Sequence, residues 1–161
     1  MGRLGVFVDP VGATFCAWEA GEREGAQLVN EPSAWSMSAL RATDTDRAAR
    51  FYGDVFGWET DAFGPATLFR LPGYVGGEEA QPVPRDVVAV MMPVETGESS
   101  VWGVDFWIDD IERGVEVVRR HGGSVLQGPF DAPPAFTQAV VADPGGAVLS
   151  ISQLRPELKS S

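Results

Sequence analysis

Apolar residues recur every three or four positions in two stretches of the chain, and this spacing predicts two helices of about three turns each. The apolar face of the first consists of Ala48, Phe51, Tyr52 and Val55. Asp44 stands where an N-cap is expected, and Gly57 follows the last turn as a residue that ends a helix. The apolar face of the second consists of Ile111, Val115 and Val118. This helix is predicted to begin near Asp109 or Asp110 and to end at Gly122-Gly123.

Shorter apolar or alternating segments, separated by Gly and Pro, predict strands on both sides of each helix. One short strand precedes each helix. The strands expected after the helices are Trp58–Phe63, Ala66–Leu71 and Asp86–Val94 in the first half, and Ser124–Phe130, Phe136–Ala142 and Ala147–Leu154 in the second. Each half therefore has the order βαβββ. Two such halves around one core predict an α+β domain over residues 36–155.

The chain also repeats itself at two distances. Residues 38–57 align with residues 104–123, 66 positions later, and each copy has a strand, an Asp, a helix and a closing Gly. Residues 5–18, GVFVDPVGATFCAW, align with residues 139–152, AVVADPGGAVLSIS, 134 positions later. Both copies of this motif contain Asp-Pro-x-Gly-Ala between apolar runs. Because Pro fixes φ and Gly accepts a positive φ, each copy predicts a β-hairpin.

Composition separates the remaining segments. Residues 1–20 form the predicted N-terminal hairpin, and residues 21–35, which are polar and rich in Gly, form a linker. The stretch Gly73–Arg85 is rich in Gly and Pro, so we expect a mobile loop of the kind that borders ligand sites. Residues 156–161 are a tail.

The balance of charges and the single cysteine narrow the class of protein. There are 12 Lys and Arg against 23 Asp and Glu, and the net charge of −11 argues against a nucleic-acid partner, because phosphate binding needs a basic face. Cys16 alone cannot form an intramolecular disulfide, which fits a reducing compartment. No apolar run reaches the ~20 residues that span a bilayer, and Asp9 and Pro10 interrupt the apolar N-terminus too early for a signal peptide. We therefore expect a soluble cytoplasmic protein without a membrane partner.

Three segments carry a family resemblance: TDTDRAARFYGDVFGWE after the first strand, WGVDFWIDDIE at the start of the second half, and VADPGGAVLSISQ near the end. They resemble the vicinal-oxygen-chelate superfamily, which includes glyoxalases, extradiol dioxygenases and bleomycin-resistance proteins. The resemblance implies paired βαβββ units that form a curved mixed sheet around a cleft. The run from DPVGATFCAW to FYGDVFGWE looks especially like the joint of tandem glyoxalase-like proteins that are often labelled hydroxylases.

The same resemblance makes residues 1–20 look like the final hairpin of a preceding glyoxalase-like domain. A lone hairpin is only marginally stable in water, so we expect it to pair with a sheet edge of its own chain or of a partner. Our prediction is a homodimer in which the hairpin docks, with exchange of the hairpin between subunits as one form of it. The sequence leaves open which edge it joins and whether it is a remnant of truncation.

Metal enzymes of this superfamily place four His or Glu ligands on strands that face the cleft. The corresponding positions here are Met37, Gly103 and Ser150, with a fourth at Met91 or Met92. The thioether of Met is too soft to bind a divalent cation of this kind of site, Gly has no side chain, and the lone hydroxyl of Ser is a weak ligand. We therefore predict that the chain holds no metal and no cofactor. The one histidine, His121, stands at the end of the second helix, where a cation suits the helix dipole.

Strand alternation, combined with the geometry that the family implies, turns Arg41 and Asp105 toward the cleft. These two either pair with each other or reach the rim, or else they anchor a ligand or act as a buried acid or base. Nine Phe and five Trp are more than a core of this size needs, so some rings are expected to line a cavity, although any single Trp fits a core equally well. The candidate ligand-binding residues are Met37, Ala39, Arg41, Trp58, Met91, Trp102, Gly103, Asp105, Trp107 and Ser150.

Three functions fit these observations. The first is a metal-independent binding protein that holds or sequesters an aromatic natural product, in antibiotic resistance or in biosynthesis. The second is a metal-independent enzyme of secondary metabolism, of hydroxylase, cyclase or isomerase type, that uses Asp105 or Arg41. The third is the non-catalytic half of a tandem protein. No catalytic residue is assigned, because the sequence contains no GxSxG, CxxC or P-loop motif.

Overall fold

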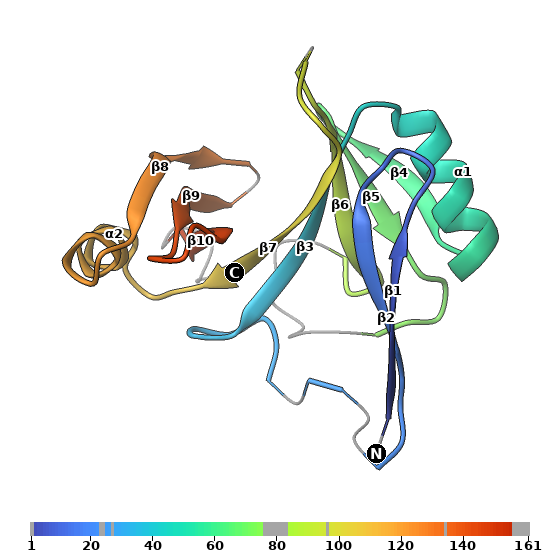
Figure 1. The fold of residues 1–161 in the computed structure, drawn as a ribbon, viewed down its shortest axis with the longest axis horizontal. Coiled ribbons are helices and arrows are strands. Elements are labelled where there is room, and N and C mark those ends of the chain that lie inside the picture. Colours follow the sequence, from blue (N-terminus) through green and yellow to red (C-terminus); the bar gives the residue numbers. More distant parts are fainter. Residues whose placement is uncertain are drawn as a thin grey trace. The chain divides into compact units, whose positions relative to one another are not determined.

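The computed structural model describes residues 2–22, 25–26, 28–75, 84–95, 97–133 and 135–155, and within them the fold is α+β (Figure 1). In chain order the elements are β1 (Arg3–Val8), β2 (Thr14–Glu19), β3 (Trp35–Ala42), α1 (Thr45–Phe56), β4 (Glu59–Phe63), β5 (Ala66–Arg70), β6 (Val87–Pro93), β7 (Val101–Trp107), α2 (Ile111–Arg120), β8 (Ser124–Ala132), β9 (Phe136–Ala142) and β10 (Val148–Leu154). Eight strands form one mixed sheet in the order β4-β5-β6-β3-β7-β10-β9-β8, while β1 and β2 form a separate hairpin. The predicted pair of βαβββ halves is confirmed.

The chain divides into two compact units, each built around one helix. The first comprises Met1–Gln27, Ser38–Gly76 and Asp86–Trp102, and the second comprises Leu28–Met37, Gly77–Arg85 and Gly103–Ser161. In the first unit β5 pairs antiparallel with β4 and β6, and β6 pairs parallel with β3. In the second, β9 pairs antiparallel with β8 and β10, and β10 pairs parallel with β7. The two units therefore have the same strand order.

Both helices begin with an Asp N-cap: Asp44, as predicted, and Asp110, one of the two predicted candidates for the second helix. The Asp44 side chain accepts a hydrogen bond from the Arg47 backbone N–H at 2.9 Å, and Gly57 ends α1 in the left-handed conformation with φ of 70°. The Asp110 side chain accepts one from the Arg113 backbone N–H at 3.0 Å. The apolar face predicted for α1 was one residue too wide, because Val55 is 53% exposed.

His121 is the C-cap residue of α2, and it is exposed. Its backbone N–H donates to the Val117 carbonyl at 3.1 Å. It therefore stands at the end of the helix, as the sequence predicted.

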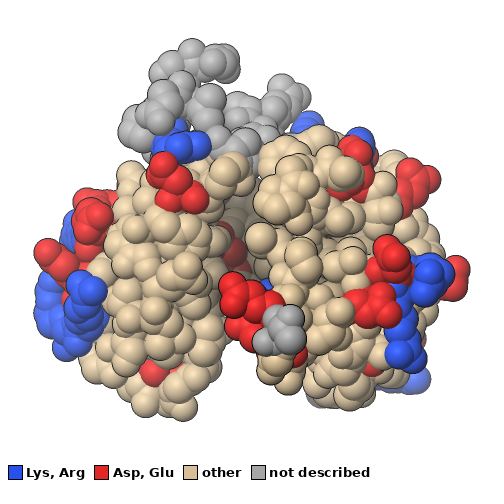
Figure 2. Space-filling view, turned by 90° about the horizontal axis from the view of Figure 1, so that it is seen from above, with Lys and Arg blue, Asp and Glu red and all other residues tan. Residues whose placement is uncertain are grey.

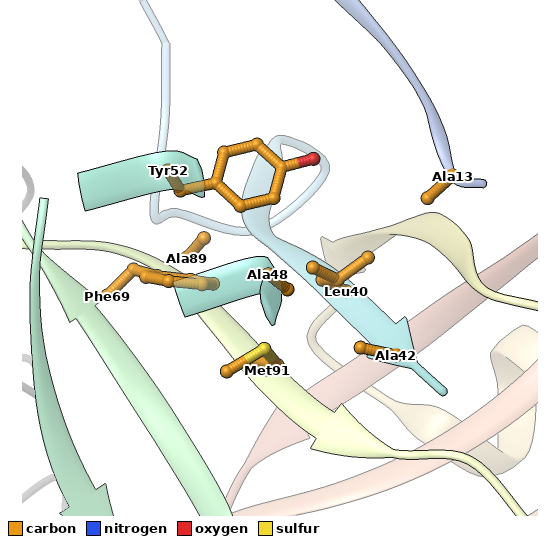
Figure 3. Close-up of a cluster of buried hydrophobic side chains, with 8 residues drawn as sticks. All are labelled: Ala13, Leu40, Ala42, Ala48, Tyr52, Phe69, Ala89 and Met91. Carbon is orange, nitrogen blue, oxygen red and sulfur yellow. The ribbon is translucent and has the colours of Figure 1, made fainter. Parts of the chain in front are cut away.

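A compact apolar core fills the first unit (Figure 3). Its buried members are Ala13, Leu40, Ala42, Ala48, Tyr52, Phe69, Ala89 and Met91. They come from the hairpin turn, β3, α1, β5 and β6, so the hairpin contributes to this core through Ala13. The second unit has its own core, where α2 packs on β9 and β10. Its buried members are Ile111, Val115, Ala139, Val141 and Ile151.

The hairpin docks through its turn and one aromatic side chain. The Asp9 side chain accepts hydrogen bonds from the backbone N–H groups of Val11 at 3.0 Å and Ala13 at 2.8 Å, and Gly12 has a φ of 91°. The ring of Phe15 meets three rings of α1, with centroid distances of 5.8 to 6.0 Å. Among the described residues, β1 and β2 pair only with each other, so of the two expected alternatives the pairing with an edge of the chain's own sheet is not found there. The predicted homodimer stays a prediction.

Parts of the predicted connecting segments lie outside the described residues. These are residues 23, 24 and 27 of the linker, residues 76–83 of the predicted loop Gly73–Arg85, and the tail at 156–161. The domain boundaries drawn from composition stay predictions.

Two surface properties bear on partners. Within the described chain neither helix has the length and apolar character needed to cross a bilayer. On the face seen in Figure 2, Lys and Arg side chains lie beside Asp and Glu, and most of that face is formed by other residues.

Candidate functional site

A buried carboxyl group, Asp105 on β7, lies at the centre of a polar cluster in the second unit. Its side chain is 7% exposed. Oδ2 accepts a hydrogen bond from the Ser36 hydroxyl at 2.6 Å and a shorter one from the Ser152 hydroxyl, and Oδ1 accepts one from the Gln138 amide nitrogen at 3.0 Å. Four strands, β3, β7, β9 and β10, thus each supply one member of this Asp105 cluster.

Burial and hydrogen bonding act in opposite directions on the pKa of Asp105. Burial removes water from the carboxylate and raises the pKa above the ordinary value for Asp. The hydrogen bonds from Ser152, Ser36 and Gln138 favour the charged form and lower the pKa, but burial is the larger effect. The neutral acid therefore persists to a higher pH than in an exposed Asp, which suits a group that holds or transfers a proton.

Strand alternation places the cluster on the sheet face opposite α2. Ala139 and Ile151 are buried on the α2 side, so Gln138 and Ser152 project to the other side. Gly103, Asp105 and Trp107 share that side on β7, as do Ser150 and Phe136 on the neighbouring strands. We call this surface the polar sheet face.

An aromatic pair borders the polar sheet face. The rings of Trp107 and Phe136 meet edge to face, with centroids 5.8 Å apart and planes at 81°. The backbone of Trp107 is fixed at the end of β7, where its N–H donates to the Ala34 carbonyl at 3.0 Å and its carbonyl accepts from Ser33 at 2.7 Å. Both residues are half-buried.

Several predicted site residues come together here. Ser150 lies opposite Asp105 in the parallel ladder of β10 and β7, and Gly103 precedes Asp105 by two residues on the same side. Trp107 follows by two residues, whereas Met37, one residue after Ser36 on β3, projects to the opposite side of that strand and is half-buried. The structure thus gathers Gly103, Asp105, Trp107 and Ser150 on one face, although nothing tests whether they bind a ligand.

Three predicted site residues belong to the packed side of the first unit instead. Met91 is 2% exposed, and its partner in the ladder is the buried Leu40. The next residue, Met92, pairs with Arg41 and is 43% exposed, so of the two methionines that the sequence leaves open as the fourth position, Met92 is the exposed one. Trp58 stacks on Tyr52 with ring centroids 5.5 Å apart, and Trp102 packs against the same core.

The charges at Arg41 and Asp105 do not pair with each other. Arg41 lies on an exposed part of β3 and forms an ion pair with Glu98. Ala39, two residues earlier, is half-buried. Of the alternatives for Arg41, a charge that reaches the surface agrees with the structure. The Asp105 carboxylate accepts hydrogen bonds from uncharged donors.

Trp102 takes part in a second buried hydrogen-bonded chain. Its indole Nε1 donates to the Tyr52 hydroxyl at 2.7 Å, and that hydroxyl donates to Asp9 Oδ2 at 2.7 Å. Burial raises the pKa of Tyr52, and the adjacent Asp9 raises it further, while the Trp102 bond lowers it. Tyr52 therefore stays protonated and joins the hairpin turn to α1 and β7.

The polar sheet face does not fit a divalent cation. Of the positions where the superfamily places ligands, Met91 is buried in the core, and Gly103 and Ser150 offer no carboxylate or imidazole. Asp105 is a single carboxylate whose oxygens already accept three hydrogen bonds. Across the described ranges, no group of three or more His, Cys, Asp and Glu is placed to bind a metal ion.

The sequence did not single out Ser36, Gln138, Ser152 or Phe136. A signal was present for Ser152, because Ser150 and Ser152 alternate with the apolar Leu149 and Ile151. Ser152 lies two residues after the candidate residue Ser150 and therefore on the same face. Ser36 could not be found in this way, because its role depends on the pairing of distant strands.

A family model described as a glyoxalase-like domain matches residues 37–152. CFP32 of Mycobacterium tuberculosis is 30% identical over 156 residues, which cover 97% of this chain and 58% of that protein. The anthracycline biosynthesis protein DnrV of Streptomyces peucetius is 32% identical over 162 residues, which cover 96% of this chain and 54% of that protein. The chain thus spans about half the length of the curated relatives it matches.

Solved structures agree with the fold. The Mn(II)-bound glyoxalase from Novosphingobium aromaticivorans has a TM-score of 0.59 at 18% identity, covering 94% of this chain and 49% of that one. The methylmalonyl-CoA epimerase from Mycobacterium tuberculosis has a TM-score of 0.52 at 12% identity, covering 84% of this chain and 98% of that one. At these identities the likeness concerns the fold alone.

Proposed function

The chain belongs to the glyoxalase-like domain family of the glyoxalase/bleomycin-resistance/dioxygenase superfamily, and from this premise we propose that it is a metal-independent binding protein for an aromatic small molecule. The observation that carries the proposal is the Asp105 cluster beside the Trp107–Phe136 pair on one sheet face. Flat rings and a few fixed polar groups are what a pocket for an aromatic ligand needs. DnrV, to which the chain is similar, is named for anthracycline biosynthesis, which involves aromatic compounds.

Asp105 acts in this proposal as the residue that orients the binding groups. Ser36 and Gln138 are half-buried, and each donates one hydrogen bond to Asp105. A primary amide has a second N–H and a carbonyl oxygen besides, and a hydroxyl can also accept. Their orientation is therefore set before a ligand arrives, which lowers the entropy lost on binding. Trp107 and Phe136 supply the stacking surface.

A titration of the tryptophan fluorescence with planar aromatic polyketides, with and without EDTA, tests the proposal. We expect saturable quenching that EDTA leaves unchanged. Asp105→Asn should weaken binding by roughly tenfold or more, the equivalent of one lost hydrogen bond to a charged group. Asp109→Asn, at an exposed Asp in the bend that follows β7, is the matched control and should bind as the unaltered chain does. Binding that needs an added metal ion, or no saturable binding across the panel, would disprove it.

A second candidate is proton transfer by Asp105 on an enolisable aromatic ligand, because burial keeps its proton at a higher pH than usual. Deuterium exchange from D2O into the bound ligand, followed by NMR, separates the two candidates. Exchange that Asp105→Asn abolishes while affinity persists supports catalysis. Binding without exchange leaves the binding protein as the function.

A further inference from the structure

Asp105 takes up most of the hydrogen-bond donors around it. A serine hydroxyl carries one hydrogen, and Ser36 and Ser152 each direct theirs to Asp105 Oδ2. The Gln138 amide nitrogen directs one of its two hydrogens to Asp105 Oδ1. Beyond these bonds the two hydroxyls can only accept, whereas Gln138 keeps one N–H and its carbonyl oxygen. Acceptors therefore outnumber donors among the groups that surround Asp105.

The most available of these acceptors is the carbonyl oxygen of Gln138, Oε1. Because the amide nitrogen is bound to Asp105 Oδ1 at 3.0 Å, Oε1 is turned away from the carboxyl group. Oε1 has no hydrogen-bond partner among the described residues, and it is not one of their buried unpaired atoms, so it is open to solvent. A ligand that covers Oε1 without donating a hydrogen bond would leave a buried acceptor unpaired, which weakens binding.

The orientation of the Gln138 amide does not depend on whether Asp105 carries a proton. An amide nitrogen cannot accept a hydrogen bond, so a proton on the carboxyl group has to lie on Oδ2, where the two hydroxyl oxygens are. Ser36 can then turn its own hydrogen to the Asp105 backbone carbonyl, which is 3.2 Å from the hydroxyl oxygen. In both states Oδ1 accepts from Gln138, and Oε1 keeps its place.

Gln138 lies beside the aromatic pair of the polar sheet face. Phe136 precedes it by two residues on the same side of β9, about 7 Å along the strand. Ser152 pairs with Gln138 in one ladder and with Trp107 in the other, so the backbones of Gln138 and Trp107 are two strand spacings, about 10 Å, apart. A flat ring system that stacks on either aromatic side chain therefore brings a substituent at its edge within reach of Gln138.

We propose that Gln138 determines the class of ligand that the polar sheet face accepts. Its Oε1 accepts a hydrogen bond from a hydroxyl group on the aromatic ring, so the site selects phenols over their methyl ethers. This inference rests on the proposed function, because it needs an aromatic ligand on this face. Asp105 is a positioning residue for this selection, since it holds the Gln138 amide in place.

Calorimetric titration of the full chain with 2-naphthol and with 2-methoxynaphthalene tests the proposal. The two probes share one ring system and differ in a single hydrogen-bond donor. We expect 2-naphthol to bind roughly tenfold more tightly, the equivalent of one hydrogen bond to an otherwise unpaired acceptor. Equal affinities, or tighter binding of the methyl ether, would overturn the inference and leave the proposed function standing. If neither probe binds saturably, the proposed function fails and the inference fails with it.

A substitution assigns the preference to Gln138. Gln138→Met keeps the length of the side chain and removes the amide, so the affinities of the two probes should come to lie within about twofold of each other. Thr137→Val, at the preceding residue on the opposite side of β9, is the matched control and should keep the roughly tenfold preference. A preference that survives in Gln138→Met would overturn the assignment.

An NMR measurement on the unaltered chain gives the same assignment if Gln138→Met does not fold. In the complex with 2-naphthol, the ring protons next to the hydroxyl group should show nuclear Overhauser effects to the side-chain amide protons of Gln138. Contacts of these ring protons with other side chains and none with Gln138 would contradict the proposal.

Discussion

The two Asp-Pro-x-Gly-Ala turns of this chain have the same local structure and different surroundings. Asp143 Oδ1 accepts hydrogen bonds from the backbone N–H groups of Gly145 and Ala147, both at 2.8 Å, as Asp9 Oδ1 does in its own turn. Asp143 is exposed, whereas Asp9 is only 4% exposed. Asp9 Oδ2 also accepts a hydrogen bond from the Tyr52 hydroxyl. The same motif therefore forms a surface turn at one place and an anchor to the core at the other. The motif determines the turn, and the residues around it determine what the turn does.

Replacing the two aspartates separately measures this difference. Asp9→Ala removes the turn hydrogen bonds and leaves the buried Tyr52 hydroxyl without its acceptor, so it should lower the free energy of unfolding by about 3 kcal/mol. Asp143→Ala removes only a surface turn acceptor and should cost about 1 kcal/mol. Urea denaturation of both variants at neutral pH gives the two values. Equal losses would show that the docking of the hairpin adds nothing to stability.

The contrast between the two turns also shows which features can be predicted from the sequence. Asp-Pro-x-Gly-Ala encodes its turn within five residues, so both hairpins could be placed from the sequence, as could the Asp44 cap. The cap of the second helix could be narrowed to Asp109 or Asp110. That β1–β2 docks through Phe15 and Tyr52 rather than by strand pairing depends on contacts between distant residues. No local pattern contains that information.

Removing the Tyr52 hydroxyl tests the hydrogen bonds that link Trp102, Tyr52 and Asp9, because Tyr52 is the central member. Tyr52→Phe keeps the ring in the core but leaves the Trp102 Nε1 and Asp9 Oδ2 unsatisfied, and we expect a loss of about 2 kcal/mol in the free energy of unfolding. The double variant with Tyr52→Phe and Asp9→Ala should lose less free energy of unfolding than the sum of the two single losses, because both substitutions remove the same hydrogen bond. Tyr74→Phe, at the other tyrosine of the chain, which is 42% exposed, should change stability by less than about 0.5 kcal/mol. Strict additivity in the double variant would contradict the hydrogen bond.

The candidate site shows the same limit. Alternation along one strand groups Gly103, Asp105 and Trp107 on one side of β7. Choosing between Met91 and Met92 required the register of β6 against β3, and a slip of one residue exchanges the two faces of a strand. The partners of Asp105 come from three other strands, so their convergence follows from sheet order and could not be obtained from spacing.

The smallest expected effect concerns the N-caps of α1 and α2, where the two halves should not differ in stability. Asp44 and Asp110 are 66 positions apart, are both exposed, and cap their helices through a backbone N–H of an Arg at 2.9 and 3.0 Å. Asp44→Ala and Asp110→Ala should each lower the free energy of unfolding by about 1 kcal/mol, and by the same amount within the error of a urea titration. Asp44→Ser and Asp110→Ser should restore most of the loss, because Ser is also a good N-cap. Clearly different losses of free energy of unfolding in the two alanine variants would mean that the energy of an N-cap depends on the half of the molecule in which it lies. The similar geometry of the two caps would then not imply a similar energy.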